Sequence, residues 1–126
     1  MEITIQFTDV PIVVPPETLP NREIGAALEF RGLVREMEGE RALEGLHYEA
    51  YEAMAHRRLG EHLAELGRQY RCAAILFIHR LGWVPVGEAS LYIRILSVHR
   101  GEAIALLAAA VDRLKQDVPI WKVAAP

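Results

Sequence analysis

The sequence contains a single cysteine, so no disulfide can form within the chain and a zinc site built from several cysteines is excluded. It has no excess of positive charge, because 14 Lys and Arg stand against 17 Asp and Glu and give a formal charge of -3. A general nucleic-acid binder needs a basic surface, so that class is excluded. No apolar run approaches the roughly 20 residues of a membrane-spanning helix. The N-terminus also lacks the basic and apolar regions of a signal peptide, which makes the cytoplasm the expected location.

Several well-known functional motifs are missing as well. The chain has no phosphate-binding loop, no dinucleotide-binding glycine pattern and no Gly-x-Ser-x-Gly nucleophile turn. His56 and His62 are six residues apart, which does not place them on one helical face, and no third ligand is evident, so we expect no metal site. Cys72 begins an apolar strand and is expected to be an inert core thiol. The 126 residues fit one globular domain, 1–126.

Hydrophobic periodicity predicts five strands and two helices. The predicted strands are residues 2–7, 26–35, 46–51, 73–78 and 89–95, and the predicted helices are residues 53–70 and 100–116. The apolar run at 73–78 is typical of a central strand that is covered on both faces. On the second helix we expect the inward face to be Ile104, Leu107, Val111 and Leu114.

The connections between these elements indicate the fold class. Four prolines between Pro11 and Pro20 predict a loop or short turn over residues 8–23. Short glycine-containing connections predict two hairpins, one of the second and third strands and one of the fourth and fifth. We therefore expect a single α+β domain, a mainly antiparallel sheet with two helices packed on one face (α/β-hammerhead-like). Residues 123–126 are expected to form a short C-terminal tail.

Lys115 is the first candidate for chemistry. Helical geometry places it on the flank of the apolar stripe, about 20° from Ile104. Either the stripe has run past the core and the ammonium group reaches water, or a partly desolvated amine lies at the mouth of a pocket and can hold an anion. Lys122, beside Trp121, is most simply a solvated lysine when taken alone. Two lysines that converge on one pocket would be harder to explain in that way.

Other basic residues lie at the ends of predicted elements. His99 and Arg100 precede the second helix, where cations are electrostatically unfavourable. Either Glu102 is their internal partner, or an anion binds at this helix terminus. Arg35 ends the second strand, on a face that is most simply solvated, although arginine is suited to bidentate recognition of phosphate.

Two further groups are expected to have no part in chemistry. His79 and Arg80 follow the fourth strand and enter a turn, so a structural role is favoured for both. Glu36 and Glu38 are expected in a hairpin loop, where carboxylates are usually solvated.

An ordered series of segments resembles the large, catalytic subunit of molybdopterin synthase, the MoaE family. The segments are Gly25-Ala26, Phe30-Arg31-Gly32-Leu33-Val34-Arg35, Tyr48-Glu49-Ala50-Tyr51-Glu52-Ala53-Met54-Ala55, His79-Arg80-Leu81-Gly82, Gly87-Glu88, Val98-His99-Arg100, Asp112-Arg113-Leu114-Lys115 and Pro119-Ile120-Trp121-Lys122. No single segment is decisive, but the ordered set with its spacings covers residues 24–122 and is highly specific.

The resemblance implies an activity and an assembly. The enzyme would be a heterotetramer, in which two large subunits form a central dimer and a ubiquitin-like small subunit docks on each. The small subunit's C-terminal Gly-Gly thiocarboxylate would enter a pocket of the large subunit. Two such sulfurs would be transferred to cyclic pyranopterin monophosphate, giving the dithiolene of molybdopterin. The resemblance implies no cofactor, no metal, and no nucleic-acid or membrane partner.

The resemblance also implies roles for particular residues. Lys115 and Lys122 would be the catalytic lysines and would also contact the substrate. The other substrate-binding residues would be Phe30, Leu33, Val34, Arg35, His99, Arg100 and Val123. Of these, His99 and Arg100 would reach the site of the other protomer. A non-catalytic binding module of the same fold, which docks a ubiquitin-like partner or an anionic ligand, is the alternative. A homo-oligomeric ligand sensor is a weaker one.

Overall fold

The computed structural model describes residues 1–125, and only the backbone of the last two of these. In chain order the elements are β1 (Glu2–Thr8), β2 (Ala26–Leu33), β3 (Met37–Glu38), β4 (Arg41–Ala42), β5 (Gly45–Ala50), α1 (Glu52–Gln69), β6 (Ala74–Arg80), β7 (Gly82–Pro85), β8 (Ala89–Ser97), α2 (Arg100–Asp117) and β9 (Ile120–Ala125). The five predicted strands and both predicted helices are present, and β3, β4, β7 and β9 are additional. The expected tail at 123–126 is instead the continuation of β9 through Ala125, and Pro126 lies outside the described residues.

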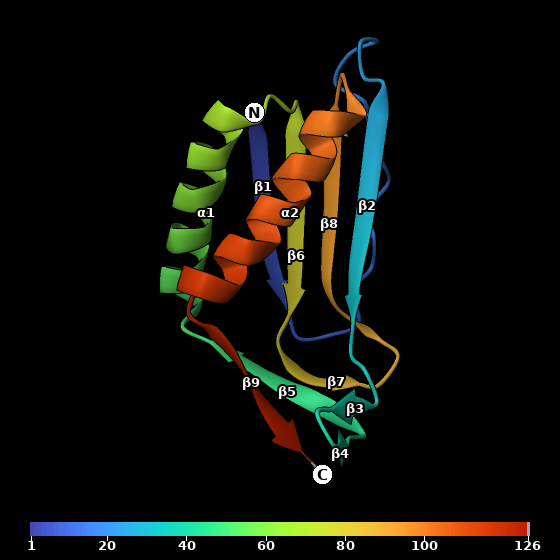
Figure 1. Ribbon diagram of the computed structural model, residues 1–126, viewed down its shortest axis with the longest axis vertical. Helices are drawn as coiled ribbons and strands as arrows, with labels where there is room; N and C mark the ends of the chain where they lie inside the picture. The colour runs from blue at the N-terminus through green and yellow to red at the C-terminus, as the bar shows by residue number, and fades with distance from the viewer. Residues whose placement is uncertain (126) are drawn as a thin grey trace.

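The main sheet has the strand order β1-β6-β8-β2. β6 and β8, and likewise β8 and β2, pair antiparallel, whereas β1 and β6 pair parallel. Both helices cover one face of this sheet (Figure 1), which confirms the predicted α+β class. The core between the sheet and the helices is formed by fully buried side chains, among them Leu59, Leu63, Phe77, Ile95 and Leu106. Neither described helix is apolar over a sufficient length to cross a membrane.

A second sheet, of order β7-β5-β9, lies across the end of the first sheet where α2 terminates (Figure 1). The predicted hairpin of the second and third strands is therefore wrong, because β2 pairs with β8 while β5 pairs with β7 and β9. The small β3–β4 hairpin turns at Gly39, where φ is 66°, and carries the chain from one sheet to the other. β6 and β8 are antiparallel as expected, although their connection contains β7.

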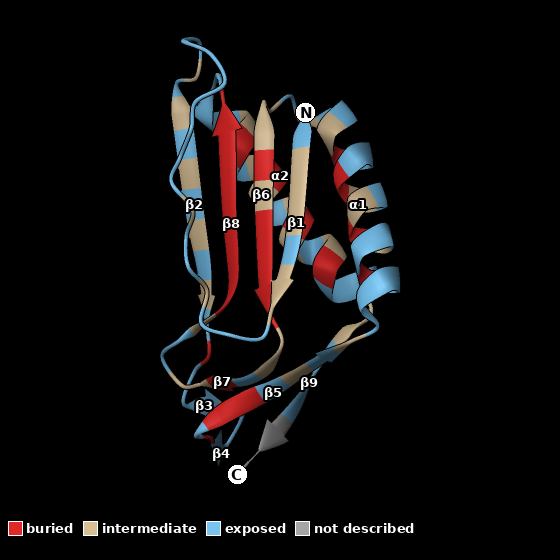
Figure 2. Ribbon diagram, turned by 180° about the vertical axis from the view of Figure 1, so that it is seen from behind, coloured by how far each residue is buried: buried red, intermediate tan, exposed pale blue. Residues whose placement is uncertain are grey.

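Residues 9–25, which form no helix or strand, run along the face of the main sheet opposite the helices, on the side of β2 and β8 (Figure 2). Arg94 Nη2 donates a hydrogen bond to the Pro15 carbonyl oxygen (2.6 Å), which ties this segment to β8. The Tyr92 hydroxyl donates to Glu29 Oε1 (2.9 Å) on the same face. On this face of β8, Tyr92 is only 1% exposed and Arg94 only 7% exposed.

The inward face of α2 differs from the expected one. Its buried residues are Ala103, Leu106, Ala110 and Leu114, whereas Ile104 is 55% exposed. The prediction is thus wrong for Ile104; Leu107 and Val111 are partly buried. α2 packs against α1 as well as against the sheet, and small alanine side chains allow both neighbours to approach closely.

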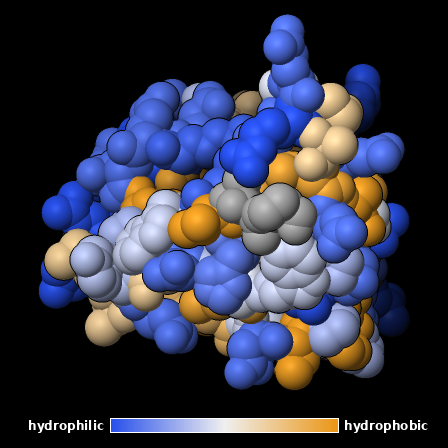
Figure 3. Space-filling view, turned by 90° about the horizontal axis from the view of Figure 1, so that it is seen from below, coloured by the Kyte–Doolittle hydropathy of each residue, from blue (hydrophilic) through white to orange (hydrophobic). Residues whose placement is uncertain are grey.

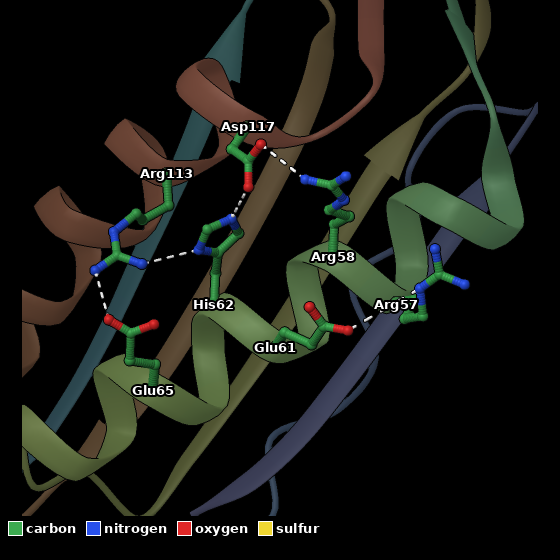
Figure 4. Close-up of polar contacts among 7 residues, drawn as sticks. All are labelled: Arg57, Arg58, Glu61, His62, Glu65, Arg113 and Asp117. Atoms are coloured by element: carbon green, nitrogen blue, oxygen red, sulfur yellow. Dashed lines mark hydrogen bonds and ion pairs between the residues drawn. The ribbon is translucent and has the colours of Figure 1, made fainter.

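Ionic contacts link the solvent-facing sides of the two helices (Figure 4). The His62 Nε2–H donates to Asp117 Oδ2 (2.8 Å), and Arg58 Nη1 donates to the other oxygen of that carboxylate (2.9 Å). Arg113 donates both to His62 Nδ1 (2.8 Å) and to Glu65 Oε1 (3.1 Å). Because Arg113 can only donate, Nδ1 of His62 accepts in this contact and Nε2 is the nitrogen that donates to Asp117. This network secures the carboxyl end of α2, close to Lys115.

Candidate functional site

A cavity of about 680 Å³ lies where the two sheets meet the last turn of α2. Its lining residues come from β2 and the segment after it, β3, β5, β6, β8, α2 and β9. They are Phe30, Gly32, Leu33, Val34, Arg35, Glu38, Leu46, Tyr48, His79, Ser90, Leu91, Val111, Leu114, Lys115, Ile120, Trp121 and Lys122. A site that so many separate elements build is fixed by the packing of the whole domain rather than by one loop.

Three cationic side chains converge on this cavity from separate parts of the chain. Arg35 follows β2, Lys115 lies in the last turn of α2, and Lys122 lies on β9. The chain contains only two lysines, and both line this one cavity. Lys115 is itself exposed, so its amine lies at the mouth of the cavity rather than in the core. The position of both lysines favours the pocket interpretation over that of two unrelated surface lysines.

One acidic side chain, that of Glu38, lies among these three cations. The Lys122 Nζ atom is 2.7 Å from Glu38 Oε1, and both side chains are partly exposed. The hydrogen bond and the charge of Lys122, together with the charge of Arg35, lower the pKa of the Glu38 carboxyl below its ordinary value. The expectation that Glu38 is merely a solvated carboxylate is therefore wrong. The turn at Gly39 folds β4 back on β3, and the contact of Glu38 with Lys122 joins β3 to β9, a long-range approach that no local pattern indicates.

Apolar and aromatic side chains form the rest of the cavity wall. Three expected substrate-binding residues, Phe30, Leu33 and Val34, are among them. Val34 is buried in a small second core, whereas Leu33 is 48% exposed. Val123, another expected substrate-binding residue, is 47% exposed and is not a lining residue.

His79 is a lining residue for which the sequence favoured only a structural role. Its side chain is 4% exposed, and its Nδ1–H donates a hydrogen bond to the Arg80 carbonyl oxygen (2.8 Å). Burial lowers the pKa of the imidazole, so the ring is neutral at pH 7. The Tyr48 ring contacts it edge-on, with the ring centroids 5.2 Å apart. The next side chain, Arg80, instead donates to Glu88 Oε1 (2.8 Å) and takes no part in the cavity.

His99 and Arg100 do not lie with the other expected site residues. They line a separate cavity of about 330 Å³ at the start of α2, together with Gly25, Val98 and Gly101. Arg100 and Lys115 are fifteen positions apart on α2, which corresponds to about 22 Å along the axis. Within one chain the two groups therefore cannot contact the same small molecule. The expectation that His99 and Arg100 serve the site of another protomer is compatible with this separation.

The end of the molecule that carries the second sheet presents apolar patches beside hydrophilic ones (Figure 3). Exposed large apolar side chains on the elements at this end include Met37, Trp83, Trp121 and Val123. The Tyr51 and Trp121 rings contact each other, with their centroids 5.0 Å apart. Aromatic side chains that stay exposed beside a cavity are typical of a surface that another molecule covers.

Comparison with known proteins finds consistent similarities. A family model described as "MoaE protein" matches residues 8–117. The chain is 43% identical over 99 residues to the molybdopterin synthase catalytic subunit of Oryza sativa subsp. indica, which covers 78% of this chain and 51% of that protein.

Two solved structures share the fold. Molybdopterin synthase from Staphylococcus aureus superimposes with a TM-score of 0.81 at 31% identity, covering 98% of this chain and 89% of that one. A chain from the complex of subunits 1 and 2 of the molybdopterin-converting factor of Helicobacter pylori has a TM-score of 0.67 at 24% identity, a likeness of fold alone. It covers 81% of this chain and 66% of that one. The chain spans about half the length of several of the curated relatives that it matches.

Proposed function

The chain belongs to the MoaE protein family, and from this premise we propose that it is the large subunit of a molybdopterin synthase. It would transfer two sulfurs from the thiocarboxylated C-terminus of a ubiquitin-like small subunit to cyclic pyranopterin monophosphate. The product would be molybdopterin, and the enzyme would act as a sulfurtransferase in the biosynthesis of the molybdenum cofactor. On the sequence alone, we expect the reaction to take place in the cytoplasm.

One observation carries this proposal: both lysines of the chain, together with Arg35, line a single cavity whose wall is otherwise largely apolar and aromatic. A phosphorylated heterocycle needs two kinds of surface, cations for its phosphate and flat apolar side chains for its rings. The cavity offers both, at a volume of about 680 Å³ that falls within the range of small-molecule sites.

The proposed roles follow from the chemistry of each group. Arg35 and Lys122 would hold the phosphate, since guanidinium and ammonium groups both bind phosphate oxygens. Each transfer forms a bond from sulfur to a pterin carbon in place of a carbon–oxygen bond of the substrate. Water attacks the acyl carbon of the small subunit, the bond from that carbon to sulfur breaks, and the C-terminus is left as an ordinary carboxylate. Negative charge develops on oxygen when the acyl carbon is attacked, and cations at the site would stabilise it. Lys115, at the cavity mouth, would exchange protons with the incoming C-terminus or form a transient covalent link with it.

The proposed assembly has two kinds of partner. The C-terminal tail of the small subunit would enter the cavity beside the exposed rings of Tyr51 and Trp121. A second copy of this chain would contribute His99 and Arg100, whose distance from Lys115 in one chain leaves them free for the partner's site. The complex of two subunits that was solved for the Helicobacter pylori protein supports the first of these partners by analogy of fold.

Reconstitution tests the proposal and separates it from the alternative of a non-catalytic binding module. The purified chain is mixed with thiocarboxylated small subunit and cyclic pyranopterin monophosphate, and molybdopterin is measured. We expect a complex and product, and small subunit that ends in an ordinary carboxylate should give the complex without product. If the thiocarboxylated partner binds but gives no product, the binding module is supported instead. If no complex forms, both functions are contradicted.

A further inference from the structure

His79 is the one buried imidazole in the cavity lining, and the proposed function gives it no role. It is the penultimate residue of β6 and lines the cavity, and strand pairing sets it opposite Leu91 of β8 and Phe7 of β1. The contact with Tyr48 fixes the plane of the ring from a third element, β5. Its position is therefore determined by the two sheets together and does not depend on a mobile loop.

The hydrogen bond at Nδ1 fixes the tautomer of this ring. A carbonyl oxygen can only accept, so Nδ1 carries a proton where it meets the Arg80 carbonyl at 2.8 Å. A neutral imidazole has a single N–H, which leaves Nε2 with a free lone pair. Among the described residues no hydrogen bond reaches Nε2, and it is not one of the polar atoms sealed away from solvent. Nε2 is thus a bare acceptor at the wall of the cavity.

The charges around the cavity give this acceptor a distinct task. Arg35, Lys115 and Lys122 attract an anion, and the one carboxylate in the lining, Glu38, is already paired with Lys122. A lone pair repels an anion, so His79 cannot share the phosphate with the cations. Nε2 of His79 can instead accept a hydrogen bond from an uncharged N–H or O–H group of a ligand. A ligand that satisfies the whole cavity must therefore carry both an anionic group and a hydrogen-bond donor.

We propose that His79 is a specificity-determining residue of this cavity, whose Nε2 accepts a hydrogen bond from a ring N–H or a hydroxyl of the bound heterocycle. The proposal rests on the proposed function, which supplies the phosphorylated pterin. The imidazole sets the orientation of the rings while the cations hold the phosphate. A buried acceptor left unpaired is costly, so ligands without a matching donor are rejected.

Two substitutions separate the two nitrogens of the ring. In His79→Asn the amide N–H can replace Nδ1–H in the bond to Arg80, but no acceptor reaches the position of Nε2. In His79→Gln the longer side chain can place its oxygen near Nε2. His56→Asn, at an exposed site on α1, is the matched control. Thermal unfolding of each variant checks that the fold is kept.

The readouts are the dissociation constant and KM of cyclic pyranopterin monophosphate, and the dissociation constant of inorganic phosphate as a probe of the cations alone. We expect His79→Asn to weaken binding of the pterin about tenfold or more and to leave phosphate binding unchanged, with partial recovery in His79→Gln. Equal affinity of His79→Asn and the unmodified protein for the pterin would overturn the proposal. An equal loss for both ligands would also overturn it, since it would indicate a purely structural role.

A measurement on the unmodified protein covers the case in which His79→Asn does not fold. Long-range ¹H–¹⁵N spectra of the histidine rings should show Nε2 of His79 unprotonated at pH 7, and its resonance should move when cyclic pyranopterin monophosphate is added but not when inorganic phosphate is added. A protonated Nε2, or no movement with the pterin, would contradict the proposal. If the unmodified protein does not bind the pterin at all, the proposed function fails and this inference fails with it; the other outcomes concern His79 alone.

Discussion

The ion pair of Lys122 and Glu38 predicts that removing a carboxylate will strengthen binding of an anion. Glu38 Oε1 lies 2.7 Å from the Lys122 Nζ atom, in a position that a phosphate oxygen would take when it binds this ammonium group. A phosphate that binds Lys122 in this position displaces the carboxylate. In Glu38→Gln the carboxamide keeps the size of the side chain but no longer competes as an anion, so the affinity for phosphate should rise.

The partial exposure of the pair limits the magnitude of this effect. Both side chains reach water, with 46% of the Lys122 side chain and 34% of that of Glu38 exposed. Pairs of this kind contribute about 0.2–1 kcal/mol. A tenfold change in affinity corresponds to about 1.4 kcal/mol, so the gain is about 1.4-fold to 5-fold. Loss of the pair should lower the free energy of unfolding by a similar 0.2–1 kcal/mol.

The assay is calorimetric titration of the chain with inorganic phosphate or pyrophosphate at low and at high salt. The matched control is Glu36→Gln, which removes the same charge from an exposed position two residues away. We expect Glu38→Gln to bind the anion more tightly than Glu36→Gln, and added salt should reduce the difference through screening. Equal affinities of the two variants, or weaker binding by Glu38→Gln, would refute the view that the carboxylate and the ligand compete for Lys122.

Two further predictions concern the fold. Gly45→Ala should lower the melting temperature, because a Cβ atom there would lie 2.5 Å from the Val84 carbonyl oxygen and 2.6 Å from the Trp83 ring. Gly101→Ala lies in open space on α2 and should raise the free energy of unfolding by up to about 1 kcal/mol. Equal melting temperatures of the two variants would contradict this. The hydrogen bond from His62 and then the charge of Arg58 lower the pKa of Asp117, so its stabilising effect is present above its ordinary pKa and is lost as pH falls through the lowered value. Urea unfolding at pH 7 and pH 3 should show a smaller loss of stability in Asp117→Asn than in the unmodified chain, and equal losses would contradict that assignment.

Local patterns were sufficient to predict the regular elements. Alternating residues such as Ile3, Ile5 and Phe7 identify a strand whatever it pairs with, and the stripe that includes Leu59 and Leu63 identifies α1 in the same way. The pairing of the strands, in contrast, could not be predicted from local patterns. β5 pairs with β9, about 75 residues further along the chain, and no short-range pattern distinguishes this arrangement from a hairpin with β2.

The face of α2 illustrates a second limit of the sequence. Leu, Ile and Val dominate any periodicity argument, yet two of the four buried residues of α2 are alanines, and Ile104 is left exposed. A small side chain carries a weak hydrophobic signal, but it permits the closest approach of a neighbouring helix. Which stripe faces inward was decided by the presence of α1, and local periodicity does not include that neighbour.

The candidate site was accessible from the sequence only in part. Six residues that the family resemblance indicated, among them Arg35, Lys115 and Lys122, line one cavity. The sequence predicts a solvated carboxylate for Glu38 and a structural role for His79, because these are the usual roles of a carboxylate in a loop and of a histidine before a turn. Their importance arises from which residues the second sheet brings near them, and that sheet exists only in the folded chain.

The central claim is that this cavity performs sulfur transfer and that Lys115 takes part in it. The most direct test is single-turnover formation of molybdopterin from cyclic pyranopterin monophosphate and thiocarboxylated small subunit, compared among the unmodified chain, Lys115→Ala and Lys115→Arg. The account predicts product from the unmodified chain and a loss of at least about a hundredfold in Lys115→Ala, with complex formation and melting temperature retained. Lys115→Arg keeps the charge but not the exchangeable amine, and it should also be impaired. Near-normal turnover by Lys115→Ala would contradict the account.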